Sequence, residues 1–361
     1  MSELASHLST FFRRRSSLPE LSLQNVTNYI DIPKGVIDLQ RPSLFSNFKD
    51  EIYFCEAFFN HYRRIGIEQF LIFDDRSSDG TDQFLQSQPD CVIIRSSLTY
   101  GQKVRFTSLD GRRQVQRAGV AFKSLIPHLF FEGKCVLNVD ADEYLLLPGE
   151  EYSICDVIDR LEESGHRAMI SPLVEFYPRH LSFSCEQCAR PTDFMSLVSN
   201  NRYFLPAPIV NVSAKGFYKV SGATKSEELF DRFSIKRSKW RPFAPRPKSP
   251  KIKIPIIKHG NDAYRIGSHQ VSTEVSPEIV LPIAHFVFTS NFFGKVERAV
   301  SWKSHSQGAS KYRYFQQLLS KMELNGDCLL GPSSRIFSSS LDLLETGLMK
   351  WPQSPGPRAR A

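Results

Sequence analysis

Two carboxylates one residue apart, Asp140 and Asp142, follow directly on the apolar run 134–139 and are themselves followed by Glu143. Oxygen ligands of this kind are the ones that hard divalent cations take in proteins. Acids crowded at the end of a buried strand also repel one another unless a cation or hydrogen-bond donors offset their charge. We interpret Asp140 and Asp142 as ligands of a divalent cation that would neutralise a leaving diphosphate. A solvated acidic turn is the alternative interpretation.

A second acidic loop occupies residues 74–81 and contains Asp74, Asp75, Ser77 and Asp79. Carboxylates here could accept hydrogen bonds from a base N–H or a ribose hydroxyl. Hydroxyl side chains could cap the following helix, whose N-terminus favours phosphate. The residue types therefore suit nucleoside recognition, although a helix-capping turn with incidental acids explains them equally well.

The segments around these loops alternate between helical and strand patterns. Apolar residues recur at helical spacing over 51–64, and Gly66 ends that helix. Short apolar runs predict strands at 69–73, 91–95 and 134–139, and the spacing of Val115, Ala118, Phe122 and Leu125 predicts a helix over 108–126 that Pro127 stops. This alternation predicts an α/β fold with a mostly parallel sheet flanked by helices. Both acidic loops then fall at carboxyl ends of strands and should open onto one crevice.

The pattern is less regular after Pro148. We expect a helix over 153–163, strands over 168–176, 217–220 and 282–288, and helices over 296–304 and 311–321. Residues 236–258 mix Pro with basic residues and predict a long loop that ends in an extended stretch. The second part of the chain should therefore be an irregular continuation of the α/β fold.

The positive charge of the 361-residue chain is local. The net charge is +8, but nine Lys or Arg and no acid lie between 236 and 258, and the remainder has 37 basic against 38 acidic residues. Such a distribution argues against a nucleic-acid partner, which usually requires a basic face. The segment could close over a diphosphate or an anionic acceptor, or rest on an acidic membrane through Trp240 and Phe243; a solvated loop is the alternative.

The cysteines and the apolar runs indicate a cytosolic protein. Seven scattered cysteines are most simply free thiols in a reducing compartment, and the lone Cys185-x-x-Cys188 is weak evidence for zinc or redox use. No apolar run reaches the length of a membrane span, and no secretory signal follows the start. We expect a cytoplasmic protein that could touch the inner face of the membrane, with residues 11–15 as a further contact.

Four motifs follow one another at the spacing of a known family. They are Lys49-Asp50-Glu51, His61-Tyr62-x-x-x-Gly66, Asp74-Asp75-x-Ser77-Ser78-Asp79-Gly80-Thr81 and Asp140-x-Asp142-Glu143-Tyr144-Leu145. The chain resembles family 2-like glycosyltransferases, in particular the bacterial branch whose second motif reads DxDE, an aromatic residue and Leu. Further matches are Glu175-Phe176-Tyr177-Pro178, Gly267-Ser268-His269, Ala284-His285-Phe286 and 308–312, so the resemblance covers about residues 47–349. Asp50 and Arg76 depart from the family, where Asn and a Gly or Asn are commoner.

The resemblance implies a GT-A, Rossmann-like fold and sugar transfer from a nucleotide-diphosphate sugar to a glycan or lipid-linked acceptor, as in cell-surface polysaccharide synthesis. It implies Mn²⁺ or Mg²⁺ at Asp140 and Asp142, and a nucleoside beside Glu51 and Asp75. The other nucleotide-binding candidates are Asp74, Ser77 and Asp79. The chain then divides into an extension (1–46), a catalytic domain (47–349) with a nucleotide-binding half (47–148) and an acceptor half (149–349), and a disordered tail (350–361).

An inverting enzyme also needs a base for the acceptor hydroxyl. Glu175 is the main candidate because it ends an apolar strand, and Asp262 is a weaker one; a structural hydrogen-bonding acid is the alternative for both. His269 or His285 could complete the metal shell or contact phosphate. We favour His269 because His285 lies in an apolar strand, where a core histidine is more common.

Two other functions fit parts of the pattern. A protein with this fold could have lost turnover and kept binding; the intact Asp140 and Asp142 argue against that alternative, and the absence of an obvious base leaves it open. A phosphotransferase of the haloacid dehalogenase type also places DxD after a strand, but it needs Thr or Val where this chain has Tyr144. A glycosyltransferase remains the function that explains most of the motifs.

Overall fold

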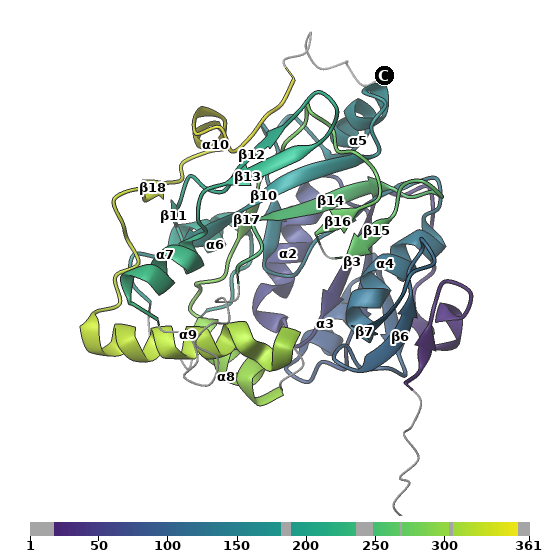
Figure 1. The fold of residues 1–361 in the computed structure, drawn as a ribbon, viewed down its shortest axis with the longest axis horizontal. Helices are drawn as coiled ribbons and strands as arrows, with labels where there is room; N and C mark the ends of the chain where they lie inside the picture. The colour runs from purple at the N-terminus through teal and green to yellow at the C-terminus, as the bar shows by residue number, and fades with distance from the viewer. Residues whose placement is uncertain (1–17, 182–188, 236–247, 268, 303–305, 353–361) are drawn as a thin grey trace, which may run out of the picture.

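The computed structural model describes residues 18–181, 189–235, 248–267, 269–302 and 306–352. Within these residues an eleven-stranded mixed sheet forms the centre of the molecule, and helices lie against it (Figure 1). The predicted α/β class, with a parallel-containing sheet flanked by helices, is therefore confirmed. In chain order its strands are β2 (Ile30–Lys34), β3 (Ser43–Phe48), β4 (Gln69–Asp74), β5 (Cys91–Ser96), β8 (Cys135–Asn138), β9 (Glu143–Leu145), β10 (Ala168–Tyr177), β11 (Tyr203–Phe204), β14 (Ile252–Lys258), β17 (Ile283–His285) and β18 (Arg335–Ile336).

Four neighbouring strands of this sheet are parallel. The order runs β8-β3-β4-β5, and each of these neighbours pairs in parallel register. Outside this group, β14 is antiparallel to β8 and β10, and β2 is antiparallel to β5. Because the carboxyl ends of parallel strands meet at one edge, the loops after β3, β4 and β8 lie together.

Helices cover both faces of the parallel strands, and the apolar side chains of β4 show this directly. Phe70 and Ile72 belong to the cluster that contains α2, whereas Leu71 and Phe73 belong to the cluster that contains α4. A strand covered on both faces is expected to consist mainly of apolar residues. The helices are α2 (Ile52–Arg64), α3 (Thr81–Ser87), α4 (Ala118–Phe130), α5 (Ile154–Glu163), α6 (Phe194–Asn200), α7 (Lys225–Arg232), α8 (Phe292–Trp302), α9 (Ser306–Asn325) and α10 (Leu341–Glu345), with a 3₁₀ turn η1 (Val26–Asn28).

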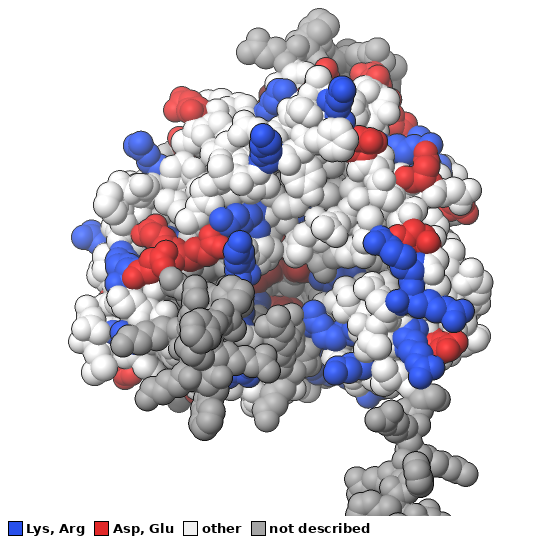
Figure 2. All heavy atoms as spheres, in the orientation of Figure 1, with Lys and Arg blue, Asp and Glu red and all other residues white. Residues whose placement is uncertain are grey.

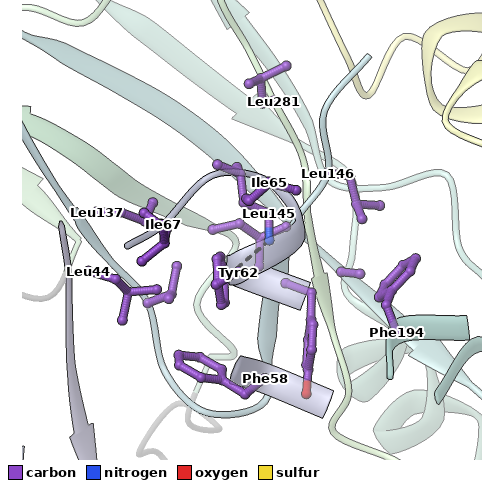
Figure 3. Close-up of a cluster of buried hydrophobic side chains, with 14 of the residues drawn as sticks. Leu44, Phe58, Tyr62, Ile65, Ile67, Leu137, Leu145, Leu146, Phe194 and Leu281 are labelled. Atoms are coloured by element: carbon purple, nitrogen blue, oxygen red, sulfur yellow. Dashed lines mark hydrogen bonds between the residues drawn. The ribbon is translucent and has the colours of Figure 1, made fainter. Parts of the chain in front are cut away.

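Helix α2 fixes the segment that follows the Asp140–Glu143 loop. Tyr62 is fully buried, and its hydroxyl donates to the Glu143 carbonyl at 2.8 Å and accepts from the Leu145 N–H at 3.1 Å. The His61 ring donates from Nε2 to the Leu145 carbonyl at 2.9 Å. Figure 3 shows Tyr62 against Leu145 within the surrounding apolar cluster. The motif His61-Tyr62 therefore holds β9 in place through its side chains.

The predicted helix over 108–126 is wrong in its first half. Residues Lys103–Thr107 and Arg113–Arg117 form an antiparallel hairpin, β6–β7, which joins β1 (Glu20–Leu21) in a separate three-stranded sheet. The turn contains Asp110-Gly111, and Gly111 has a φ of 79°, a conformation that glycine adopts without strain. Val115, expected on a buried helical face, is 59% exposed on β7. Pro127 does not stop α4, which continues past it and ends at Phe130.

Several strands of the main sheet escaped the sequence analysis, including the short strands β9, β11 and β18. No element was predicted before Lys49, yet β2 and β3 lie there and pair in the sheet. The polar residues of β3 hid it, and tertiary partners satisfy its serines: the Ser46 hydroxyl donates to the Val139 carbonyl at 2.6 Å, and the Ser43 hydroxyl accepts from Gln69 Nε2 at 2.8 Å. The stretch predicted to end the basic loop is β14, a buried strand between β8 and β10.

Two small sheets lie outside the main sheet. Their strands are β12 (Ile209–Val212) with β13 (Tyr218–Ser221), and β15 (Arg265–Gly267) with β16 (Gln270–Val271).

Several sequence-based expectations fall outside the described residues. They are the Cys185-x-x-Cys188 pair, the basic residues 236–247, the Phe-Arg cluster 11–15 and most of the expected tail, 353–361. Among the helices that the structure describes, none combines the length and the apolar character that a membrane crossing requires. The division of the chain into a nucleotide-binding half and an acceptor half stays a prediction.

We predict that Tyr62→Phe lowers the free energy of unfolding by about 1–3 kcal/mol, because the Glu143 carbonyl and the Leu145 N–H lose a buried partner. Denaturant unfolding followed by circular dichroism measures the change. Tyr29→Phe is the control, since the hydrogen bonds of Tyr29 within the described chain use its backbone. Equal stability of the two variants would show that the Tyr62 hydroxyl does not hold β9.

Candidate functional site

A pocket of about 390 Å³ lies at the carboxyl ends of β3, β4 and β8. Both acidic loops border it, as the sequence predicts, and helices α8 and α9 form its other wall. Figure 2 shows Asp and Glu side chains on the floor of a hollow near the centre of this face, with Lys and Arg around the mouth. Its volume is in the range typical of small-molecule sites. Its charged lining residues are Lys49, Asp50, Glu51, Asp75, Arg117, Lys123, Asp140, Asp142, Glu143, Lys295, Arg298 and Lys311.

Asp140 is held between two lysines. Its Oδ1 lies 2.5 Å from Lys123 Nζ of α4, and its Oδ2 lies 3.2 Å from Lys253 Nζ of β14. Burial alone would raise the pKa of Asp140, but the two ammonium groups outweigh it and hold the pKa well below its usual range. The side chain remains 39% exposed and faces the pocket. Asp140 is therefore ionised and available to a ligand.

Glu143 shares one of these lysines below the pocket floor. Its carboxylate contacts the buried Lys253 ammonium and accepts a hydrogen bond from the Asp140 N–H at 2.8 Å. Burial raises the pKa of Glu143, and Lys253 opposes that shift. The backbone contact fixes the turn in which Asp140 stands. The third acid of the motif thus has a structural role in the acidic loop.

Asp142 and Glu51 meet at a third lysine. Lys295 Nζ of α8 lies 2.8 Å from Asp142 Oδ2 and 3.9 Å from Glu51 Oε1, and His285 Nε2 lies 3.8 Å from the same Asp142 oxygen. Burial raises the pKa of Asp142, but Lys295 and His285 outweigh it, so the net direction is downward. For Glu51 burial dominates and raises the pKa to about 7 despite Lys295. The two carboxylates therefore differ in protonation near neutral pH.

The first acidic loop divides into a pocket residue and residues that build the loop. Asp75 lines the pocket and accepts the Tyr100 N–H at 3.0 Å. Asp74 is buried and accepts the Ser77 N–H at 3.2 Å, while Ser77 Oγ accepts the Asp50 N–H at 2.9 Å. Asp79 accepts the Ile52 N–H at 3.1 Å, at the start of α2. Of the predicted nucleotide-binding residues, Glu51 and Asp75 line the pocket, whereas Asp74, Ser77 and Asp79 are absent from its described lining.

Neither candidate base lines this pocket among the described residues. Both carboxylate oxygens of Glu175 contact Ser226 in the first turn of α7: the N–H donates at 2.6 Å and the hydroxyl at 2.7 Å. Asp262 lies on the surface in an ion pair with Arg167. Glu175 therefore stabilises the N-terminus of a helix, and this placement favours the structural alternative for both acids.

Both histidines singled out in the sequence reach the pocket. His269 Nδ1 donates to the Ile252 carbonyl at 2.8 Å, which leaves Nε2 as the lone-pair nitrogen. Burial, with Lys253 as the next cause, lowers the pKa of His269 to about 4, so the ring is neutral at physiological pH. His285 lies beside Asp142. A neutral ring with a lone pair on Nε2 suits metal or phosphate contact.

The side chains around the pocket could hold a divalent cation only if a bound ligand supplied further oxygen atoms to it. In the described part of the chain no three His, Cys, Asp or Glu side chains are grouped closely enough to enclose a metal ion. Both oxygens of Asp140 contact ammonium groups, whereas the Asp142 contacts to Lys295 and His285 involve Oδ2. Mg²⁺ is commonly bound by one or two carboxylates, water and substrate phosphates. The site fits that mode and does not fit an all-protein cage.

The sequence analysis missed the three lysines that balance these acids. Lys123 interrupts the apolar run 121–126, and Lys253 stands between Ile252 and Ile254. A lone lysine inside an apolar segment indicates a buried ion pair, since an ammonium group is rarely buried without one. That signal was available for both residues. Lys295 carries no comparable signal, because its helix is amphipathic and its exposed positions accept lysine.

Comparison with known proteins leaves the chain without a demonstrated family. No family model matches it, and no curated protein matches it. Among solved structures it is similar to the UTP-bound UGPase from Acinetobacter baumannii, with 10% identity, 85% of this chain and 92% of that chain covered, and a TM-score of 0.24. At that score the likeness carries no argument about this chain.

We predict that removing the Glu51 carboxylate changes how stability depends on pH. Because its pKa rises from 4.5 to about 7 on folding, the wild type should lose stability relative to Glu51→Gln as the pH climbs through this interval. The difference should reach on the order of 3 kcal/mol above pH 7. Thermal and denaturant unfolding across this range measure it. Glu56→Gln, on the exposed side of α2, controls for loss of a charge; parallel curves for wild type and Glu51→Gln would contradict the assignment.

We predict that Glu175→Gln destabilises the fold by about 1 kcal/mol, because a neutral amide replaces the carboxylate at the start of α7. Denaturant unfolding measures the loss, with the exposed Glu68→Gln as the matched control. If the two variants unfold alike, Glu175 does not cap this helix.

Proposed function

We propose that this protein transfers a sugar from a nucleotide-diphosphate sugar to a glycan or lipid-linked acceptor. The observation that carries the proposal is the meeting of two acidic loops, from the ends of β4 and β8, on one pocket that also has basic walls. A nucleotide sugar needs polar acceptors for its base and ribose, and positive charge for its diphosphate. This pocket offers both, and the resemblance of its motifs to family 2-like glycosyltransferases points to the same chemistry.

On the donor side, Glu51 and Asp75 are the carboxylates that would accept hydrogen bonds from the nucleoside. Both line the pocket, and the contact of Asp75 with the Tyr100 N–H orients its carboxylate. The residues around them, Asp74 and Asp79, hold the loop and the start of α2 in shape. The nucleoside would therefore meet a preformed surface, which lowers the entropy cost of binding.

On the diphosphate side, Asp142 and Asp140 would hold a divalent cation, Mn²⁺ or Mg²⁺, with His269 as a further candidate ligand. Bound there, the cation would neutralise charge on the leaving diphosphate. Lys295 keeps Asp142 ionised and positioned, and Lys123 does the same for Asp140. Arg298 and Lys311 line the same pocket and would add positive charge near the phosphates.

The two rival functions differ from this proposal in the reaction that follows binding. A binding protein that has lost activity would share the pocket and the nucleotide affinity, so only release of nucleotide from the sugar separates it. A phosphotransferase would use a carboxylate as its nucleophile. Both oxygens of Asp140 contact ammonium groups, which disfavours that role.

The proposal is tested by a thermal-shift screen of nucleotide sugars with and without Mn²⁺, because ligands of the native state raise its apparent stability. We expect Mn²⁺-dependent stabilisation by one nucleotide class, and loss of that shift and of turnover in Asp142→Asn. The matched control is Asp262→Asn, which removes a surface carboxylate outside the pocket.

Turnover is followed as nucleotide released from the stabilising donor. A variant Asp142→Asn with wild-type donor binding and nucleotide release would refute the proposal. Stabilisation without nucleotide release in the wild type, with or without acceptor glycans, would favour the inactive binding protein.

A further inference from the structure

Helix α8 brings two basic side chains to the pocket. Lys295 and Arg298 are three residues apart, a spacing that places side chains on one face of a helix, and both line the pocket. The Lys295 ammonium group lies 2.8 Å from Asp142 Oδ2 and 3.9 Å from Glu51 Oε1. A single side chain thus joins α8 to the carboxylate at which the proposed function places a divalent cation.

The lysines around the acidic loop differ in their access to the pocket. The Lys253 side chain is 2% exposed and is absent from the described lining, whereas Lys123 at 8% and Lys295 at 23% both line the pocket. A lysine carries its charge at the end of a flexible stem, so its ammonium group can move between nearby acceptors. Lys295 is therefore the lysine best placed to exchange a carboxylate for a ligand in the pocket.

The two carboxylates proposed to hold a cation already contact ammonium groups. Asp140 contacts Lys123 and Lys253. Asp142 contacts Lys295. These lysines offset the negative charge that would attract a cation, and an ammonium group repels a cation that is bound to the same carboxylate. Solvent screens this repulsion only weakly at Asp142, which is 14% exposed, so a divalent cation alone should bind here weakly.

We propose that Lys295 couples the binding of the cation at Asp142 to the binding of the diphosphate. The proposal rests on the proposed function. In the absence of a diphosphate, the Lys295 ammonium group pairs with Asp142 and opposes a cation on that carboxylate. A bound diphosphate accepts hydrogen bonds from Lys295, with Arg298 on the same face of α8, and its negative charge offsets both the ammonium group and the cation. Each ligand therefore strengthens the binding of the other.

A purely structural role for Lys295 would have the opposite effect on the cation. If the ammonium group served only to hold Asp142 in position, its loss would let the carboxylate move and would weaken cation binding. If the ammonium group opposes the cation, its loss leaves a partly buried carboxylate without its nearest cationic partner and strengthens cation binding. The sign of the change in cation affinity separates the two roles.

The first measurement is the affinity of the full chain for Mn²⁺ without nucleotide, followed by electron paramagnetic resonance of the free ion. We expect Lys295→Gln to bind Mn²⁺ about tenfold more tightly than the wild type, because a charge that opposes the cation is removed. Lys295→Met, which keeps an apolar stem near the Phe54 ring, is a second variant without the charge and should behave in the same way.

Two further variants serve as controls. Lys295→Arg keeps the positive charge and should bind Mn²⁺ no more tightly than the wild type. Lys49→Gln removes a cation from the lining of the same pocket, but the ion pair of Lys49 is with Asp50 at 3.7 Å. Its effect on the affinity for Mn²⁺ should be much smaller than that of Lys295→Gln.

The second measurement is the affinity for UDP, GDP, ADP and CDP with and without Mn²⁺, by isothermal calorimetry. In the wild type, Mn²⁺ should tighten the binding of one of these nucleotides. In Lys295→Gln, the factor by which Mn²⁺ does so should be about tenfold smaller. Coupling is reciprocal, so a variant that binds Mn²⁺ more tightly by itself, and equally in the complex, must show this smaller factor.

An unchanged or lower affinity of Lys295→Gln and Lys295→Met for Mn²⁺ would overturn the inference, as would an unchanged coupling factor. In either case, Mn²⁺-dependent nucleotide binding by the wild type would leave the proposed function standing. If none of the four nucleotides binds the wild type with Mn²⁺, the proposed function and this inference both fail.

Discussion

Three lysines from three different elements balance the carboxylates on the floor of the pocket. Lys123 comes from α4, Lys253 from β14 and Lys295 from α8, and their partners are the acids after β8. Carboxylates this close together repel, and a buried charge is strongly unfavourable unless it is paired. The acidic loop can therefore exist in its observed position only because the surrounding elements bring these ammonium groups to it.

This balance links the fold to the chemistry of the pocket. Lys253 is buried beneath the loop and contacts both Glu143 and Asp140, so β14, the strand between β8 and β10, also supplies a charge to the site. Asp140 and Asp142 stay ionised, while Glu51, where burial dominates, has a pKa near neutrality. The same lysine, Lys295, thus lies beside the ionised Asp142 and beside Glu51, whose pKa is near neutrality.

Positioning of the loops uses many residues that never face a ligand. Tyr62 and His61 hold β9 behind the acidic loop, and Asp74 and Asp79 accept backbone N–H groups in the first loop. Rigid support of this kind keeps the few pocket-lining groups in a defined geometry, which binding and catalysis both need. It also explains why Asp75 of the first acidic loop lines the pocket, whereas Asp74 and Asp79 are absent from its described lining.

The sequence by itself determined the α/β class, the strands β4, β5 and β8, and the meeting of two acidic loops at one edge of the sheet, because these follow from local periodicity and from the geometry of parallel strands. Only the tertiary structure decided the hairpin β6–β7, the strand β3, the helix-capping role of Glu175 and the lysine partners of the acids. Each of those depends on contacts between residues far apart in the chain, such as Lys253 with Glu143, and the pairing of such distant residues leaves no periodic signal in one sequence.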